Sequence, residues 1–329
     1  MAHEIDMSNG RANVAFIGEV PWHGLGQQLT EDSTIDEWQT QAGMDWDIRQ
    51  SPAMGIDEDT VFAFPERSIL YRSDTRAPLS IVSDQYQVVQ PKEVLEFYRD
   101  LTETAGFKLN TAGVLFGGRK FWALAELGES ATLMGRDKID GYLLLATSCD
   151  GSLATAAQFT SVRVVCNNTL TMATRSYDGK RNSIKIPHSR VFNHDDVKAE
   201  LGVAGDSFDF FIENANTLSL APASDNAAIE FVNRTLNMLP LNAEMDDEHL
   251  KASDSKAGLI ILDLYAGGGR GSLLPSALGT YWGLVNAVTE YQDHHRNTKT
   301  SDSRLNRTWF GDGAAMKDHA FKLAMDMAA

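Results

Sequence analysis

The most informative stretch of this chain is residues 150–190, which read DGSLATAAQFTSVRVVCNNTLTMATRSYDGKRNSIKIPHSR. Asp150 and Gly151 are typical turn residues, and they separate two apolar runs at residues 142–149 and 153–159. Two apolar runs joined by an Asp-Gly pair predict a β-hairpin. The stretch therefore begins with two paired strands of a predicted antiparallel sheet.

Strand signals continue through most of residues 45–160. Gly117 and Gly118 separate two further apolar runs and predict a second hairpin. One amphipathic helix interrupts the strands: Pro91 suits its first turn, and its apolar face is formed by Val94, Leu95, Phe97, Tyr98 and Leu101. This order predicts an α+β fold, with an antiparallel sheet and packed helices in the N-terminal part and a mainly helical C-terminal part.

Residues 160–175 allow two structures. Thr160 can cap a helix that runs from Ser161 to Arg175, and in that helix one face is formed by Arg163, Asn167, Thr171 and Arg175. The run from Val162 to Val165 is β-branched apart from Arg163, so it could begin a strand instead. We expect the helix and keep the strand as its alternative.

The pattern changes after Pro187, where helical periodicity replaces strand signals. Helices are expected over residues 195–201, 207–218, 224–236, 275–296 and 313–327, with a polar loop at 297–306. Near the other end, a short helix is expected over residues 34–42, with Ser33 as its N-cap. The predicted regions are an acidic N-terminal arm at 1–44, an α+β core domain at 45–190 and a helical C-terminal region at 191–329.

The composition is that of a soluble globular protein. The 329 residues are 43% hydrophobic and 22% charged, and the formal net charge is −16. No apolar run is long enough for a transmembrane helix, and the first residues have no secretory signal. Cys149 and Cys166 lack the spacing of metal ligands, so we expect a reducing, cytoplasmic compartment and no membrane association.

Several motifs resemble one known family. They are Pro-Trp-His-Gly-Leu-Gly at 21–26, residues 142–151, residues 162–170, and residues 279–294 with their Gly-Thr-Tyr-Trp-Gly start. Together they resemble the phage/plasmid-like family, a domain of unknown function found on bacteriophages, plasmids and integrating elements. The family pattern has proline where this chain has Ser161. The resemblance implies a mobile element in a bacterial host, and it implies no established reaction.

The order of elements is also similar, at the level of fold, to the hairpin-plus-helix core of phage single-strand annealing proteins. Those proteins form rings or filaments and hold DNA in a basic groove. The resemblance implies the same activity and a homo-oligomer for this chain, by analogy of fold alone.

A basic segment lies within this acidic chain. Residues 160–190 hold six Lys and Arg side chains against the single acid Asp178, a net charge of +5. Binding of single strands without sequence preference needs cations for phosphates and flat rings for bases. The predicted nucleic-acid-binding residues are Arg163, Asn167, Arg175, Tyr177, Lys180, Arg181, Lys185 and Arg190, together with Arg119 and Lys120 of the second hairpin. A solvated surface is the alternative explanation.

A second candidate site is the group Glu290, Asp293 and His294. These residues share one helix face at i, i+3 and i+4, and they could ligate a metal. The spacing lacks a diagnostic catalytic motif, so we favour a salt-bridged helix surface and predict no metal. The glycine-rich residues 267–272 lack the lysine of a P-loop and are expected to form a hinge or linking loop. With no nucleophile motif either, we predict no cofactor and no enzymatic activity.

These observations favour a mobile-element protein that binds single-stranded DNA and promotes annealing and recombination without nucleotide hydrolysis. An exposed strand edge and a repeated shallow site would suit a homo-oligomer. Two other classes stay open. The acidic segments 1–60 and 191–254 would suit a DNA mimic that occupies a defence nuclease, and the Glu290 group would suit a metal-dependent hydrolase or nuclease.

Overall fold

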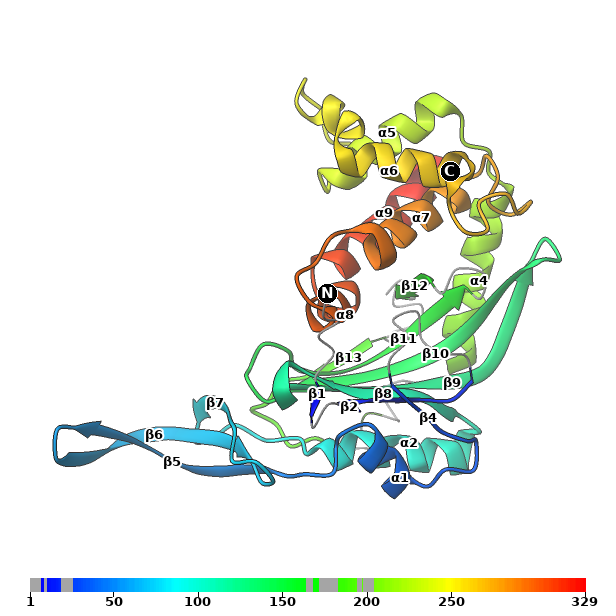
Figure 1. Cartoon of the computed structure of the whole chain (residues 1–329). Helices are drawn as coiled ribbons and strands as arrows, with labels where there is room; N and C mark the ends of the chain where they lie inside the picture. The colour runs from blue at the N-terminus through cyan, green and yellow to red at the C-terminus, as the bar shows by residue number, and fades with distance from the viewer. Residues whose placement is uncertain are drawn as a thin grey trace. The chain divides into compact units, whose positions relative to one another are not determined.

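The computed structural model describes residues 7–8, 11–18, 26–163, 168–171, 183–193, 197 and 204–329 (Figure 1). Strands dominate the N-terminal part and helices the C-terminal part, which confirms the predicted α+β class. The chain forms two compact units. Unit 1 consists of Met1–Gly128, Leu143–Gln158 and Tyr177–Gly202, and unit 2 consists of Glu129–Tyr142, Phe159–Ser176 and Val203–Ala329.

The larger sheet has eight strands in the order β12-β11-β10-β9-β8-β3-β4, and β13 also pairs with β11. The long strands β9, β10 and β11 contribute residues to both units. The strand bounds are β3 Val14–Phe16, β4 Gln27–Gln28, β8 Lys108–Leu115, β9 Lys120–Leu133, β10 Asp137–Ser148, β11 Thr155–Arg163, β12 Asn168–Thr171 and β13 Ser183–Ile186.

Both predicted hairpins are present. β8 and β9 pair antiparallel around a short turn, η1 Phe116–Gly118, where Gly117 and Gly118 have φ angles of 70° and 103° that favour glycine. β10 and β11 are neighbours in the sheet on either side of the turn at Asp150 and Gly151. The turn residues together with the apolar runs beside them were therefore sufficient to predict these pairs.

The predicted helix from Ser161 to Arg175 is wrong, and the strand alternative is correct for its described residues. β11 continues through Arg163, and residues 168–171 return antiparallel beside it as β12. Pairing on both edges of β11 explains the outcome. β-branched side chains fit a strand that has neighbours on both sides, and this packing outweighs a local capping signal.

The helices α2 and α1 both belong to unit 1. α2 Pro91–Ala105 begins at the predicted proline, and its Tyr98 is fully buried with its hydroxyl 2.8 Å from the carbonyl oxygen of Ala123. α1 Ile35–Gln41 is capped by Thr34 rather than by Ser33. The Thr34 Oγ1 accepts from the Glu37 N–H at 3.2 Å, and the Glu37 carboxylate accepts from the Thr34 N–H at 2.7 Å. This reciprocal capping box selects Thr34.

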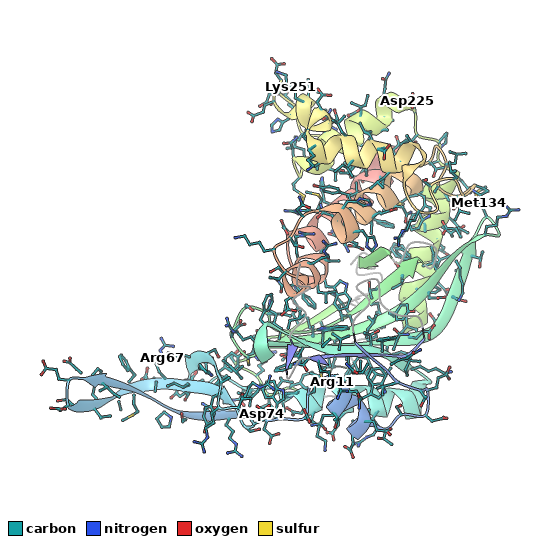
Figure 2. All side chains as sticks on the ribbon, viewed as in Figure 1. Arg11, Arg67, Asp74, Met134, Asp225 and Lys251 are labelled. Carbon is teal, nitrogen blue, oxygen red and sulfur yellow. The ribbon has the colours of Figure 1, made fainter. Side chains whose placement is uncertain are left out.

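Unit 1 also holds two small sheets. One pairs β1 Met7–Ser8 with β2 Arg11–Ala12, and the other has the order β5-β6-β7. The bounds of the second are β5 Ile48–Asp57, β6 Thr60–Arg72 and β7 Pro78–Ser83. Its base is fixed by Arg72, which is buried over the Trp46 ring at 4.0 Å and bonded to Asp74 at 2.7 Å. Figure 2 labels Asp74 beside this base.

Asp74→Asn is expected to lower the free energy of unfolding by about 1 kcal/mol at pH 7. The hydrogen bond from Arg72 lowers the pKa of Asp74 from 3.8 to about 2. As the pH falls, the Asp74 carboxylate therefore becomes protonated in the unfolded chain at a higher pH than in the folded protein. The stabilisation is present above pH 3.8 and is lost as the pH approaches 2. We discount its size because the Asp74 side chain is 39% exposed.

Urea unfolding at pH 7 and at pH 2 checks this prediction. The difference between Asp74→Asn and wild type should shrink at pH 2, and Asp59→Asn, on the exposed hairpin turn, should match wild type at both values. An Asp74→Asn deficit that is equal at the two pH values would contradict the assignment to the ionised pair.

Unit 2 contains most of the helices of the described chain. α5 matches the helix expected over residues 224–236, and Ser224 is its N-cap, accepting from the Ala227 N–H at 3.3 Å. Residues 297–306, expected to be a loop, contain the start of α8, because Thr300 caps a helix there and accepts from the Ser303 N–H at 3.0 Å. The bounds are α4 Ala204–Leu220, α5 Asp225–Leu236, α6 Lys256–Asp263, α7 Tyr281–Glu290, α8 Ser301–Phe310 and α9 Asp312–Ala328.

The described residues of unit 2 also form three short helical turns. They are the 3₁₀ turn η2 His249–Asp254 and the two single π turns η3 Leu264–Gly268 and η4 Tyr291–His295. Of the helix predicted at residues 195–201, only Val197 lies within the described residues. No helix in the described ranges is both long and apolar enough to span a bilayer.

Candidate nucleic-acid interface

The basic segment is attached to one strand, β11, at two places. β12 pairs antiparallel with the second half of β11, so that Thr171 is opposite Thr160. β13 pairs antiparallel with the first half, so that Ser183 is opposite Gln158. β12 and β13 therefore run in the same direction along β11, with residues 172–182 of the chain between them.

Four of the ten predicted contact residues belong to the part of the sequence between these two attachments. Arg175, Tyr177, Lys180 and Arg181 lie outside the described residues, as does Asn167. The described flanking residues place both ends of the sequence 172–182. It begins after a residue paired with Thr160 and ends before a residue paired with Gln158.

The other predicted contact residues differ in exposure. Lys185, on β13, and Arg190 are exposed, and Arg119 is exposed beside the η1 turn. Arg163 ends β11, where its backbone pairs with Asn168. Lys120 is only 7% exposed, and its burial lowers its pKa. A buried ammonium is poorly placed to contact phosphate, so Arg119 is the better candidate of the two neighbours.

The chain after β13 is fixed by His188, within unit 1. Its ring stacks on Tyr86 at 4.4 Å between centroids, and its two ring nitrogens lie 3.1 Å from the Gln87 carbonyl oxygen and 3.0 Å from that of Leu153. The Tyr86 hydroxyl donates to the Ser148 carbonyl oxygen at 2.9 Å. These contacts hold both sides of the turn of the β10–β11 hairpin against the chain that follows β13.

Sequence reasoning missed the roles of Tyr86 and Gln87. Both residues are about a hundred positions away from His188 in the sequence. Neither residue carries a local motif that would indicate this contact. Burial raises the pKa of Tyr86, so its hydroxyl stays protonated and acts as a donor.

Cys149 is buried beside the Asp150 turn and has no nucleophilic character. Burial, assisted by the neighbouring Asp150 charge, raises the pKa of its thiol to about 12. A thiol in this state is an inert packing group at neutral pH. Cys166, its expected neighbour in the core, lies outside the described residues.

The second candidate, the Glu290 group, is buried in unit 2 and is not a helix surface. Glu290 and Asp293 are 4% and 5% exposed. The Glu290 carboxylate accepts from the Arg270 backbone N–H at 3.0 Å, and Asp293 pairs with Lys317 at 2.8 Å. Among the described residues, no group of three His, Cys, Asp or Glu side chains has the arrangement of a metal site.

The expected surface position of this group is therefore wrong. An i, i+3, i+4 spacing is the same on a buried and on an exposed helix face. The partner that decides the outcome, Lys317, is on a different helix.

The glycine-rich stretch at residues 267–272 packs against the Glu290 carboxylate and donates a backbone hydrogen bond to it. A side chain at Gly269 would place its Cβ 2.7 Å from the Leu264 carbonyl oxygen and 3.0 Å from the Glu290 carboxylate. Only glycine allows this close approach, which brings the Arg270 N–H to Glu290. The stretch is a packed turn within unit 2 and provides no phosphate cradle.

Comparisons with known proteins add one assignment. No curated protein and no solved structure matches the chain. One family model matches residues 78–309, which covers the second hairpin, β11 to β13 and most of the helical part. The chain therefore belongs to the DUF932 family, a domain of unknown function.

Proposed function

We propose that this protein binds single-stranded DNA through residues 160–190 and aligns complementary strands for annealing, without nucleotide hydrolysis. The observation that supports the proposal is the double attachment of the basic segment. β12 and β13 hold the two ends of the sequence 172–182 beside neighbouring residues of β11. The described residues on either side of that sequence therefore pair with one edge of β11.

The charge distribution is consistent with a local site. A net charge of −16 repels a polyanion at long range, so binding requires a local concentration of cations that contacts phosphates directly. Residues 160–190 carry a net charge of +5. In the proposed complex Arg175, Lys180, Arg181, Lys185 and Arg190 bind phosphates, and Tyr177 stacks on a base. Arg119 adds a further cation, and Lys120 does not take part because it is buried.

Annealing follows from such a site without an energy source. Base pairing and stacking release the free energy, and the protein contributes only by holding two strands in alignment. We include in the proposal that a mobile genetic element encodes the protein, which rests on the motifs at residues 21–26, 142–151, 162–170 and 279–294. The cytoplasm of a bacterial host is the corresponding compartment.

The double substitution Lys180→Ala with Arg181→Ala is expected to weaken single-strand binding for every sequence alike. Two phosphate contacts are lost, and each should reduce the slope of log affinity against log salt concentration by about 0.7. Fluorescence anisotropy of a labelled oligonucleotide across a salt series measures both effects. In the proposal these two cations face the bound DNA, and hence solvent in the free protein, so thermal melting should change by less than about 0.5 kcal/mol.

The matched control is Lys251→Ala with Lys256→Ala, which removes two exposed cations from unit 2, outside the basic segment. It changes the net charge equally and should leave the salt slope as in wild type. A strand-annealing assay with two complementary labelled oligonucleotides, without magnesium or nucleotide, should show the same order of variants. Equal affinity of both double variants and wild type, with intact folds, would refute the proposed interface.

A further inference from the structure

The β5–β6 hairpin has an unusual surface for a two-stranded ribbon. From Thr60 to Arg67 every residue of β6 is exposed, and the ribbon extends away from the rest of unit 1 (Figure 1). The side chains of the ribbon point outward along both strands in the stick view, where Arg67 is labelled (Figure 2). The ribbon nevertheless carries exposed large apolar side chains at Met54, Ile56, Val61, Phe62 and Phe64.

These apolar side chains occupy both faces of the ribbon. Ile56 is directly opposite Val61, and Met54 is on the same face of β5. On the other face, the Phe62 ring covers Gly55 and lies 5.4 Å from the Phe64 ring. An isolated two-stranded ribbon is marginally stable in water, and exposed apolar patches mark interaction sites. The hairpin therefore has the character of an interface.

The outer edge of β5 is free to pair with another strand. β5 is the terminal strand of its sheet, and among the described residues only β6 pairs with it. The outward backbone groups can be identified from both ends. The backbone N–H and C=O of Ile48 form hydrogen bonds with the side-chain amide of Gln90, so they point away from β6. At the other end, Asp57 pairs with Thr60 across a two-residue turn, so the backbone N–H and C=O of Asp57 point toward β6.

The outward groups are consequently those of the even-numbered residues. The N–H groups of Gln50, Met54 and Ile56 and the adjacent carbonyl groups are available, whereas Pro52 offers only a carbonyl. The side chain of Gln90 already forms hydrogen bonds with the backbone N–H and C=O of Ile48, so a pairing strand can extend no further than Gln50 at that end. If two copies of β5 pair antiparallel, the hydrogen bonds join outward backbone groups of both strands. An even-numbered residue of one copy must therefore be opposite an even-numbered residue of the other.

One self-pairing register also satisfies the charges. If two copies of β5 pair about a two-fold axis at Ala53, Gln50 faces Ile56 of the second copy, and Pro52 faces Met54. Arg49 then faces Asp57 in a non-hydrogen-bonded pair, where side chains are closest, and this happens twice by symmetry. Arg49 and Asp57 are exposed and form no ion pair with another described residue of the chain.

We propose that two copies of this chain associate through the outer edges of β5, antiparallel and centred on Ala53. The paired hairpins then form one four-stranded sheet, in which Pro52, Met54, Ile56 and Val61 of both copies make a continuous apolar face. The interface is isologous, since the same residues contribute from each copy. It requires no DNA, and its test is independent of the proposed single-strand binding.

Charge reversal provides the test, by sedimentation velocity at micromolar concentrations. Wild type should be a dimer. Arg49→Asp and Asp57→Arg should each raise the dimer dissociation constant about tenfold or more, because each places like charges opposite one another twice. The double variant should return close to the wild-type constant. Asp59→Arg, on the turn beyond the paired residues, is the matched control and should dimerise as wild type does.

Mixing the two single variants sharpens the test. In a one-to-one mixture of Arg49→Asp and Asp57→Arg, the mixed dimer has opposite charges at both positions, so association should reappear although each variant alone is weak. Misfolding cannot produce that result. A monomeric wild type, single variants that associate as wild type does, or a mixture that stays monomeric would each overturn the proposal.

Discussion

Lys317→Ala is expected to lower the free energy of unfolding by about 3–5 kcal/mol, the largest effect of any charge substitution considered for this chain. Lys317 and Asp293 form an ion pair at 2.8 Å, and their side chains are only 3% and 4% exposed. Burial lowers the pKa of Lys317, which reflects the cost of keeping its charge away from water. Removing the lysine leaves the Asp293 charge buried without its ammonium partner.

The same helix supplies a matched control. Lys322 also lies on α9 and pairs with Asp318 at 2.6 Å, but its side chain is 52% exposed. Lys322→Ala should therefore cost less than about 1 kcal/mol. Urea unfolding of the two variants compares a buried and an exposed pair directly. Replacing the buried pair together, with Lys317→Met and Asp293→Leu, should recover most of the lost stability, because no isolated charge remains. A small loss for Lys317→Ala would contradict the buried-pair assignment.

Asp137→Ala is expected to destabilise unit 2 by about 3 kcal/mol, since it leaves two buried donors without their acceptor. Asp137 lies at the start of β10 and is fully buried. Its Oδ2 atom accepts from the Ser276 hydroxyl at 2.7 Å and from the Trp282 Nε1–H at 3.0 Å. The residue thus joins one strand segment of unit 2 to the beginning of α7.

Asp137→Asn tests whether hydrogen bonding or the side-chain volume is responsible. The amide oxygen keeps one acceptor, so Asn should cost less than Ala. Asp140→Ala, on the same strand and 8% exposed, removes a carboxylate paired with the partly exposed Lys138 and should have the smaller effect. Denaturant unfolding followed by tryptophan fluorescence measures all three. Equal losses for Asp137→Asn and Asp137→Ala would show that the Trp282 and Ser276 bonds contribute little.

The parts of the fold that the sequence predicts correctly depend on neighbouring residues. Pro91 and the apolar face at Tyr98 predict α2, and the Gly117 and Asp150 turns predict both hairpins, because each signal is complete within a few residues. The N-cap of α1 shows that even a local prediction can be wrong by one residue. Ser33 and Thr34 are equivalent by residue type, and only the Glu37 carboxylate three residues later selects Thr34.

The parts that the sequence predicts incorrectly depend on distant partners. Thr160 has the chemistry of an N-cap, yet strand pairing with Thr171 decides its conformation. The spacing of Glu290 and Asp293 is compatible with a surface, and the packing of Lys317 and Arg270 against them decides their burial. For the candidate interface, the sequence supplies the charges and the structure supplies the two attachments on β11; the contacts with DNA remain predictions.

The division of the chain has a consequence for its synthesis. Unit 1 needs residues 177–202 to be complete, and unit 2 begins at residue 129 and continues to the C-terminus. As the ribosome extends the chain, the segments of the two units emerge alternately. Unit 1 cannot finish folding before residue 202 has been made, and unit 2 cannot finish before residue 329 has been made, so the early segments of both units lack their packing partners at first. Such a chain folds late and largely as a whole, and a chaperone that holds nascent strands would be expected to raise its yield.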